Sequence, residues 1–171
     1  MEGWKHLSFR ENSMFIDRAR SFCESHIAEK FKDEYNCYPM EVYCKEDKDG
    51  KTYKVLILGK HFKEDKFKVF TGCTFVKEGK RPQPEFQEET FKSCDGTDCT
   101  LADDKKAKIK NSINAYFKGE KDFEPLKYFE NALDGANAYV VKVDGKYAAI
   151  YEIGDEVTVD CCFQSKYIIN K

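Results

Sequence analysis

Three histidines and eight cysteines are the side chains of this sequence best able to do chemistry. His26 lies within one helical turn of Cys23 and Glu29, a set of types that could supply a base, a nucleophile and an orienting carboxylate. The same spacing is typical of a partly buried histidine beside a disulfide, and eight paired cysteines would leave no free thiol. His6 and His61 lie in segments without a motif. We therefore expect no enzyme and no catalytic residue.

Other patterns that could do chemistry are weak. The acidic pairs Glu88-Glu89 and Asp103-Asp104 fit ordinary solvated charges. The acidic segment from Cys94 to Asp98 does not match the spacing of an EF-hand loop, and no glycine-rich phosphate-binding loop occurs. The sequence therefore predicts no cofactor and no metal ion.

The cysteines indicate a disulfide framework, because their count is even and they are scattered rather than gathered in the closely spaced Cys/His pairs that zinc requires. Such frameworks are typical of secreted proteins. The first residues, Met1 to Lys5, do not form a signal peptide, so we expect a secreted, extracellular mature form. Candidate pairs join Cys23 to Cys37 or Cys44, and Cys99 to Cys161 or Cys162. The sequence leaves the connectivity open among all eight, which are Cys23, Cys37, Cys44, Cys73, Cys94, Cys99, Cys161 and Cys162.

The composition predicts a folded chain with a mixed surface. Of the 171 residues, 41% are hydrophobic and 15% are aromatic, which argues against disorder. The 29 basic and 31 acidic residues are interleaved and give a net charge of −2. Such a surface lacks the basic patch that nucleic acids and anionic membranes attract. There is also no apolar run long enough to cross a bilayer, so we expect neither nucleic acid binding nor membrane insertion.

The first half reads as one helix followed by four antiparallel strands. Apolar residues at three- and four-residue steps predict a helix from about Ser13 to Tyr35, with Asn12 or Ser13 as its cap. The Asp49-Gly50 pair favours a tight turn. The strand after it is apolar on both faces, so we expect it to be central and covered by the helix. The predicted strands are Tyr38–Cys44, Tyr53–Leu58, Phe67–Lys77 and Glu85–Ser93, with a charged connecting loop at 61–66.

The second half repeats this order in reduced form. Residues 94–99 are rich in turn formers and lose periodicity, which predicts a boundary between domains at 1–99 and 100–171. Helical spacing returns around 107–117, and Leu126, Phe129 and Leu133 predict another short helix after Pro125. The last predicted strands are Ala138–Val143, Tyr147–Ile153 and Val157–Phe163.

This order of elements, the stretch Lys51–Gly59 and the segment from Cys73 through a proline-containing loop to Cys94 resemble the cystatin superfamily over about residues 3–99. The resemblance implies an α+β fold with a long helix packed on a curled antiparallel sheet, followed here by a second, reduced helix-plus-hairpin unit, all stabilised by disulfides. It also implies a Cys73–Cys94 disulfide, because secreted cystatins link their last two strands across a similar distance.

Inhibitory cystatins bind papain-like proteases through an N-terminal glycine and two hairpins. Gly3 matches the glycine, but the first hairpin is charged where theirs is apolar, and the second has prolines and no tryptophan. Burying such charges unpaired costs several kcal/mol. We therefore expect a protein that binds another extracellular protein through loops, as an inhibitor or immune modulator, with protease inhibition as the alternative. The expected binding residues are Gly3, Trp4, Lys45, Glu46, Asp47, Lys48, Asp49, Gly50, Lys80, Arg81, Pro82, Gln83 and Pro84.

A second alternative belongs to a different functional class. Trp4-Lys5 with Leu7, together with Cys161-Cys162 at the end of a late strand, look like features of the lipocalins of blood-feeding arthropods. That resemblance implies a barrel that carries a small hydrophobic ligand in an internal pocket. The helical spacing from Phe15 to Phe31 argues against a barrel of this kind.

Overall fold

A computed structural model describes residues 2–164, which form ten strands and two helices. The first sheet contains five strands in the order β1-β2-β3-β4-β5, and each strand is antiparallel to its neighbours. Its strands are β1 (Lys5–Leu7), β2 (Tyr35–Asp47), β3 (Gly50–His61), β4 (Phe67–Lys77) and β5 (Pro84–Cys94). The strand β3 is central, as its two-sided apolar pattern predicts.

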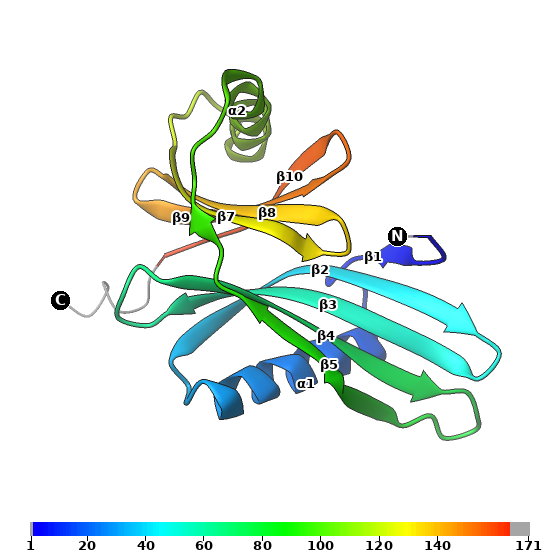
Figure 1. Cartoon of the computed structure of the whole chain (residues 1–171). Coiled ribbons are helices and arrows are strands. Elements are labelled where there is room, and N and C mark those ends of the chain that lie inside the picture. The colour runs from blue at the N-terminus through cyan, green and yellow to red at the C-terminus, as the bar shows by residue number, and fades with distance from the viewer. Residues whose placement is uncertain (1, 165–171) are drawn as a thin grey trace.

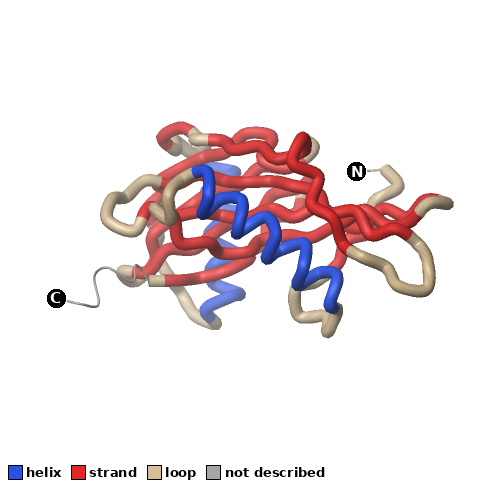
Figure 2. Tube along the Cα trace, turned by 90° about the horizontal axis from the view of Figure 1, so that it is seen from below, coloured by secondary structure: helices blue, strands red, loops and turns tan. Residues whose placement is uncertain are grey.

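Helix α1 (Met14–Lys30) crosses one face of the first sheet, as Figure 2 shows. Ser13 caps the helix, and its hydroxyl accepts a hydrogen bond from the Ile16 amide at 3.4 Å. The apolar stripe of α1 packs on the side chains of β2, β3 and β4 that face it. The buried members of this cluster include Ile16, Ala19, Cys23, Ile27, Val42, Val55, Ile57 and Phe70.

The second sheet also has five described strands, in the order β10-β9-β8-β7-β6. They are β6 (Thr97–Asp98), β7 (Glu124–Leu133), β8 (Ala136–Val143), β9 (Lys146–Ile153) and β10 (Glu156–Phe163). Helix α2 (Asp103–Phe117) packs on the outer face of this sheet through Ile109 and Ile113. The chain passes from one sheet to the other at residues 95 and 96, within the segment predicted as a boundary. The division into domains 1–99 and 100–171 stays a prediction.

The two sheets face each other between the two helices, so the molecule has four layers (Figure 1). The main core lies between the sheets and draws side chains from both halves. The largest contributions come from aromatic and aliphatic residues of β2, β3, β4, β7, β8 and β9, among them Tyr43, Leu56, Leu58, Phe67, Phe129, Tyr147 and Tyr151. Within residues 2–164, no helix is long and apolar enough to span a membrane.

The predicted fold class is wrong, because strands dominate the described chain. The two helices have 17 and 15 residues, and α1 ends at Lys30 rather than near Tyr35, where β2 already begins. The second half is not a reduced helix-plus-hairpin unit, since its sheet has as many described strands as the first. The short strands β1 and β6 were missed because two or three residues are too few to show a two-residue alternation.

The helix predicted at 126–133 is also wrong, since this segment is β7. The strand pairs with β8 but shifts register twice, between Pro125 and Lys127 and between Phe129 and Leu133. Each shift inserts unpaired residues, so the apolar side chains that face the core recur at steps of three and four. The irregular strand pairing therefore gives the apolar residues a spacing that is also typical of a helix.

The disulfide prediction is wrong as well, because all eight cysteines are free thiols. Cys94 pairs in register with Val69 of β4. Cys73 lies four residues further along β4, so it is roughly 13 Å from Val69 and no nearer to Cys94. A disulfide needs Cα atoms within about 7 Å. Cys99 follows β6 and Cys161 lies on β10, at opposite edges of the second sheet. The thiols serve as small packing groups, and burial raises the pKa of Cys37 and Cys161 to about 12.

Candidate functional site

The two loops that were predicted to bind a partner lie together at one end of the first sheet, drawn at the right of Figure 1. The turn between β2 and β3 is fixed by Asp47, whose carboxylate accepts hydrogen bonds from the Asp49 amide at 2.8 Å and the Gly50 amide at 3.1 Å. The loop between β4 and β5 is tied to this turn, because the Glu78 amide donates to the Asp49 carbonyl at 3.0 Å. We call this region the loop end; it comprises residues 2–5, 13–16, 45–51 and 76–84.

Gly50 is required by the close approach of β4 at the loop end. A Cβ atom at this position would clash with the carbonyl oxygen of Val76 and would lie 3.0 Å from the Cα atom of Lys77. Both atoms belong to the backbone of a paired strand, so neither can move aside cheaply. The glycine therefore lets the first hairpin lie flat against the strand that leads into the second loop.

The first of two hollows at the loop end has a volume of about 400 Å³. Its apolar part is formed by Phe15 at the start of α1, Val76 and Pro82. Charged side chains of both signs surround this apolar part, and they come from both loops. They are Glu46, Asp47, Lys51, Lys77 and Glu78.

The second hollow, of about 360 Å³, lies toward β1 and includes Gly3, Lys5 and Cys44. Burial raises the pKa of the Cys44 thiol, so this side chain stays neutral. The two hollows share Glu46 and Lys51, whose charged groups are 3.0 Å apart. The predicted N-terminal residue Gly3 is thus brought beside the first hairpin, although more than 40 residues separate them in the sequence.

Trp4 belongs to the loop end and also packs against the main core. The ammonium groups of Lys45 and Lys54 lie 5.9 Å and 5.0 Å from the centre of its indole ring. Lys54 also bonds Asp134 of the β7–β8 turn at 2.6 Å. Trp4 is therefore held by cation–π contacts as part of the scaffold, and it is only half-buried.

The remaining predicted residues are distributed around the first hollow. Lys48 and Asp49 are exposed at the hairpin tip, and Lys80, Arg81 and Gln83 are exposed on the second loop. Pro84 begins β5 and pairs in register with Val76, so it supports the loop rather than lining a hollow. The structure therefore brings together all the segments that were predicted to bind.

Sequence reasoning missed the contribution of helix α1 to this site. Phe15 was assigned to the apolar stripe of the helix, and Met14 was not singled out, although it is 59% exposed. The available signal was that Met14, Phe15 and Ile16 are consecutive apolar residues in one turn. A helix can direct only part of such a run toward the sheet, so the others must face solvent or a partner.

The histidines that were considered for catalysis contact aromatic rings and backbone amides. His26 lies between the rings of Phe86 and Phe91, at 5.2 Å and 4.6 Å, and its buried Nε2 atom has no hydrogen-bond partner among the described residues. His61 accepts hydrogen bonds from the amides of Lys63 and Glu64 at its Nδ1 atom, both at 3.2 Å. Among residues 2–164, no group of three His, Cys, Asp or Glu side chains could hold a metal ion.

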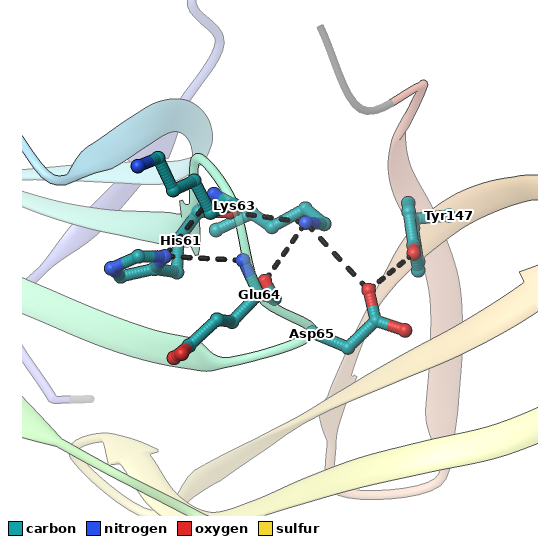
Figure 3. A network of polar contacts seen from close by, with 6 residues as sticks. His61, Lys63, Glu64, Asp65 and Tyr147 are labelled. Atoms are coloured by element: carbon teal, nitrogen blue, oxygen red, sulfur yellow. Dashed lines mark hydrogen bonds and ion pairs between the residues drawn. The ribbon is translucent and has the colours of Figure 1, made fainter. Parts of the chain in front are cut away.

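Figure 3 shows a polar network at the opposite end of the first sheet. The buried ammonium group of Lys60 donates to the carbonyls of His61 and Glu64, both at 3.0 Å, and lies 3.7 Å from Asp65. Tyr147 on β9 donates its hydroxyl to Asp65 at 2.6 Å. Burial lowers the pKa of Lys60, although Asp65 opposes this shift. The network, which we call the junction end, joins the first sheet to the second.

Comparisons with known proteins found no match among protein-family models, curated proteins or solved structures.

Proposed function

We propose that this chain is a binding protein that engages another protein through the loop end of the first sheet. The observation that carries the proposal is the convergence of three separate segments around two adjoining hollows that share Glu46 and Lys51. These segments are the N-terminal residues with the start of α1, the β2–β3 turn and the β4–β5 loop. Loops held on a rigid scaffold are the usual place for recognition in proteins.

Preorganisation of the loop end supports this proposal. The β2–β3 turn is closed by the carboxylate of Asp47, and the second loop is bonded to the turn through Glu78 and Asp49. A surface that is already ordered loses little conformational entropy when it binds, so more of its contact energy appears as affinity. The loop end is ordered by its own hydrogen bonds and does not need a partner to form.

The chemistry of the surface favours a particular kind of partner. The half-buried apolar side chains of Phe15 and Pro82 line the first hollow among charges of both signs. An apolar centre inside a polar rim is typical of protein interfaces. The mixed charge is unlike the basic surface that nucleic acids require. The partner we propose presents an apolar side chain to the first hollow and flanks it with charged residues of both signs.

Secretion, an extracellular partner and a role as inhibitor stay predictions. The argument for secretion depended on disulfides, and the free thiols remove it. Inhibition of papain-like proteases and transport of a hydrophobic ligand are outcomes that the experiment on binding must separate.

The test is affinity capture followed by charge reversal. The immobilised protein is incubated with plasma and with a panel of papain-like proteases, and the bound species are identified by mass spectrometry. The double variant Lys80→Glu with Arg81→Glu reverses two exposed charges on the rim of the loop end. The matched control, Lys106→Glu with Lys108→Glu, reverses two exposed charges on α2.

We expect the same partner to be captured by the wild-type protein and by the α2 control, and its dissociation constant to rise at least tenfold for the loop-end variant. Equal binding by both variants would remove the loop end from the interaction. Capture of a papain-like protease that depends on Gly3 would instead support the inhibitor alternative. Retention of a small hydrophobic molecule, with no protein partner, would support the carrier.

A further inference from the structure

A second polar cluster lies where the edge strand β10 of the second sheet meets β2 of the first, beside β1. Both β2 and β10 change register beside this contact, between Pro39 and Glu41 and between Val159 and Cys161. Asp160 is therefore the extra residue of a bulge, and Glu41 directly follows one. Bulges redirect side chains away from the regular alternation of a strand. Here they bring two carboxyl groups into the layer between the sheets.

The cluster reaches across both sheets, and Glu41, Tyr43 and Tyr151 are buried whereas His6 is 59% exposed. The side chain of Glu41 is 6% exposed, and one of its oxygens contacts Nε2 of His6 on β1. The ring of His6 stacks on Tyr43 at 4.8 Å. The hydroxyl groups of Tyr43 and Tyr151 lie 2.8 Å apart and join β2 to β9 by a hydrogen bond.

Asp160 is the member of the cluster that has a buried oxygen without a hydrogen bond among the described residues. This oxygen is its Oδ2 atom. Burial raises the pKa of Asp160, and the neighbouring carboxylate of Glu41 raises it further. Ionised carboxylates only accept hydrogen bonds, so this pair can bond to each other only when one of them keeps a proton.

We propose that Glu41 and Asp160 share one proton at neutral pH and form a proton-dependent joint that holds β10 against β2, next to β1. Loss of this proton at alkaline pH leaves two adjacent buried negative charges, which repel each other and loosen the contact. Because β1 leads directly to Trp4 and Gly3, the joint also regulates the order of these N-terminal residues of the loop end. This last consequence rests on the proposed function, whereas the joint itself does not.

The tyrosine and cysteine side chains that face the pair stay neutral, so they bring no positive charge that could stabilise two ionised carboxylates. Burial raises the pKa of Tyr43 on β2 and of Tyr151 on β9, so both hydroxyls stay neutral. The Cys161 thiol on β10 also stays neutral, because burial and Asp160 raise its pKa to about 12. His6 on β1 carries a positive charge beside Glu41 only when it is protonated.

The direction of the effect on stability follows from proton linkage. The pKa of Asp160 is higher in the folded chain than in the unfolded chain, so folding retains a proton that unfolding releases. The stabilisation is fully present below the ordinary aspartate pKa of about 3.9. It decreases as the pH rises from there toward the raised value of the folded state.

The test compares the wild-type protein with Asp160→Asn in denaturant unfolding from mildly acidic to mildly alkaline pH. Asparagine has almost the same shape and can donate a hydrogen bond to Glu41 without a shared proton. We expect the unfolding midpoint of the wild-type protein to fall as the pH rises and that of the variant to change much less. Equal pH profiles for the two proteins would overturn the proposal.

Two measurements on the protein without any partner separate the joint from the binding function. The wild-type protein should show the infrared band of a protonated carboxyl group at neutral pH, and Glu41→Gln or Asp160→Asn should lose it. Absence of that band in the wild-type protein would overturn the proposal even if neither variant folds. Hydrogen exchange at Lys5–Leu7 should accelerate at alkaline pH beyond that of an unstructured reference peptide. Unchanged protection there would mean that the joint does not control β1.

Discussion

The sequence Lys-Glu-Asp-Lys occurs once at each end of the first sheet, and the two copies have opposite roles. At the loop end it is residues 45–48, and at the junction end it is residues 63–66. In the first copy, Asp47 bonds the amides of its own turn and leaves the surrounding charges in solvent. In the second copy, Asp65 bonds Tyr147 of the other sheet and lies beside the buried Lys60.

The difference comes from what surrounds each copy rather than from the four residues themselves. Asp49-Gly50 follows the first copy and closes a tight turn between β2 and β3. The second copy is preceded by Lys60, which is 2% exposed and whose ammonium group also faces the rings of Phe67 and Tyr147. One end of the sheet thus joins the two sheets, and the other is the end that we propose binds a partner.

The largest effect that we expect comes from removing the buried charge at the junction end. Lys60→Ala removes three polar contacts and the packing of the aliphatic stem, and it leaves two carbonyls without their donor. The free energy of unfolding should fall by roughly 2–4 kcal/mol, measured by urea unfolding. Lys60→Met keeps most of the packing, so it should be less destabilising. If Lys60→Ala unfolded at the same urea concentration as the wild-type protein, the junction end would not hold the sheets together.

The next largest effect tests whether the backbone of the loop end is closely packed, even though the charged side chains there are exposed. Gly50→Ala places a Cβ atom against the backbone of β4, so the hairpin must move away from the second loop. The expected loss is about 1–3 kcal/mol in unfolding free energy, with shifted amide resonances at 45–51 and 77–80. Gly79→Ala is the matched control, because a Cβ atom there meets nothing within 4 Å. If Gly50→Ala and Gly79→Ala lower the unfolding free energy equally, the close approach of β4 is not the reason for a glycine at position 50.

A smaller effect is expected from the bond that links the junction to β9. Tyr147→Phe keeps the ring and removes the hydroxyl that donates to Asp65. Since the Asp65 side chain is 68% exposed, water can replace the lost donor. The unfolding free energy should therefore fall by about 0.5–1.5 kcal/mol, measured in parallel with the Lys60 variants. A loss of unfolding free energy as large as that of Lys60→Ala would mean that the Tyr147 hydroxyl contributes as much to the junction end as Lys60 does.

Local patterns predicted the first half of the fold better than the second. The cap at Ser13, the Asp49-Gly50 turn and the central position of β3 follow from interactions within a few residues. In the second half, the register shifts of β7 replace simple alternation by irregular spacing, so this strand was predicted as a helix. The overall class was wrong because nothing in the local pattern reveals that two sheets share one core.

The candidate site was predictable to a similar extent. Turn-forming residues marked both loops of the loop end, but the hydrogen bond between Glu78 and Asp49 and the place of Phe15 depend on the tertiary fold. The cysteines misled the interpretation, because count and spacing cannot distinguish paired thiols from small buried side chains. Cys23 shows this, since its sulfur packs 3.4 Å from where a Cβ atom on Gly72 would be.

The smallest effect that we expect lies at the centre of the loop end. The Lys51 and Glu46 side chains are 50% and 69% exposed, so solvent screens their attraction. Lys51→Ala should change the unfolding free energy by less than about 0.5 kcal/mol, even though Lys51 lines both hollows. A loss above about 1 kcal/mol would mean that this ion pair holds the hairpin, and the contrast with Lys60 would fail. A stable variant with weakened partner binding would instead show that the exposed charges of this end serve recognition, whereas the buried charge at the other end serves the fold.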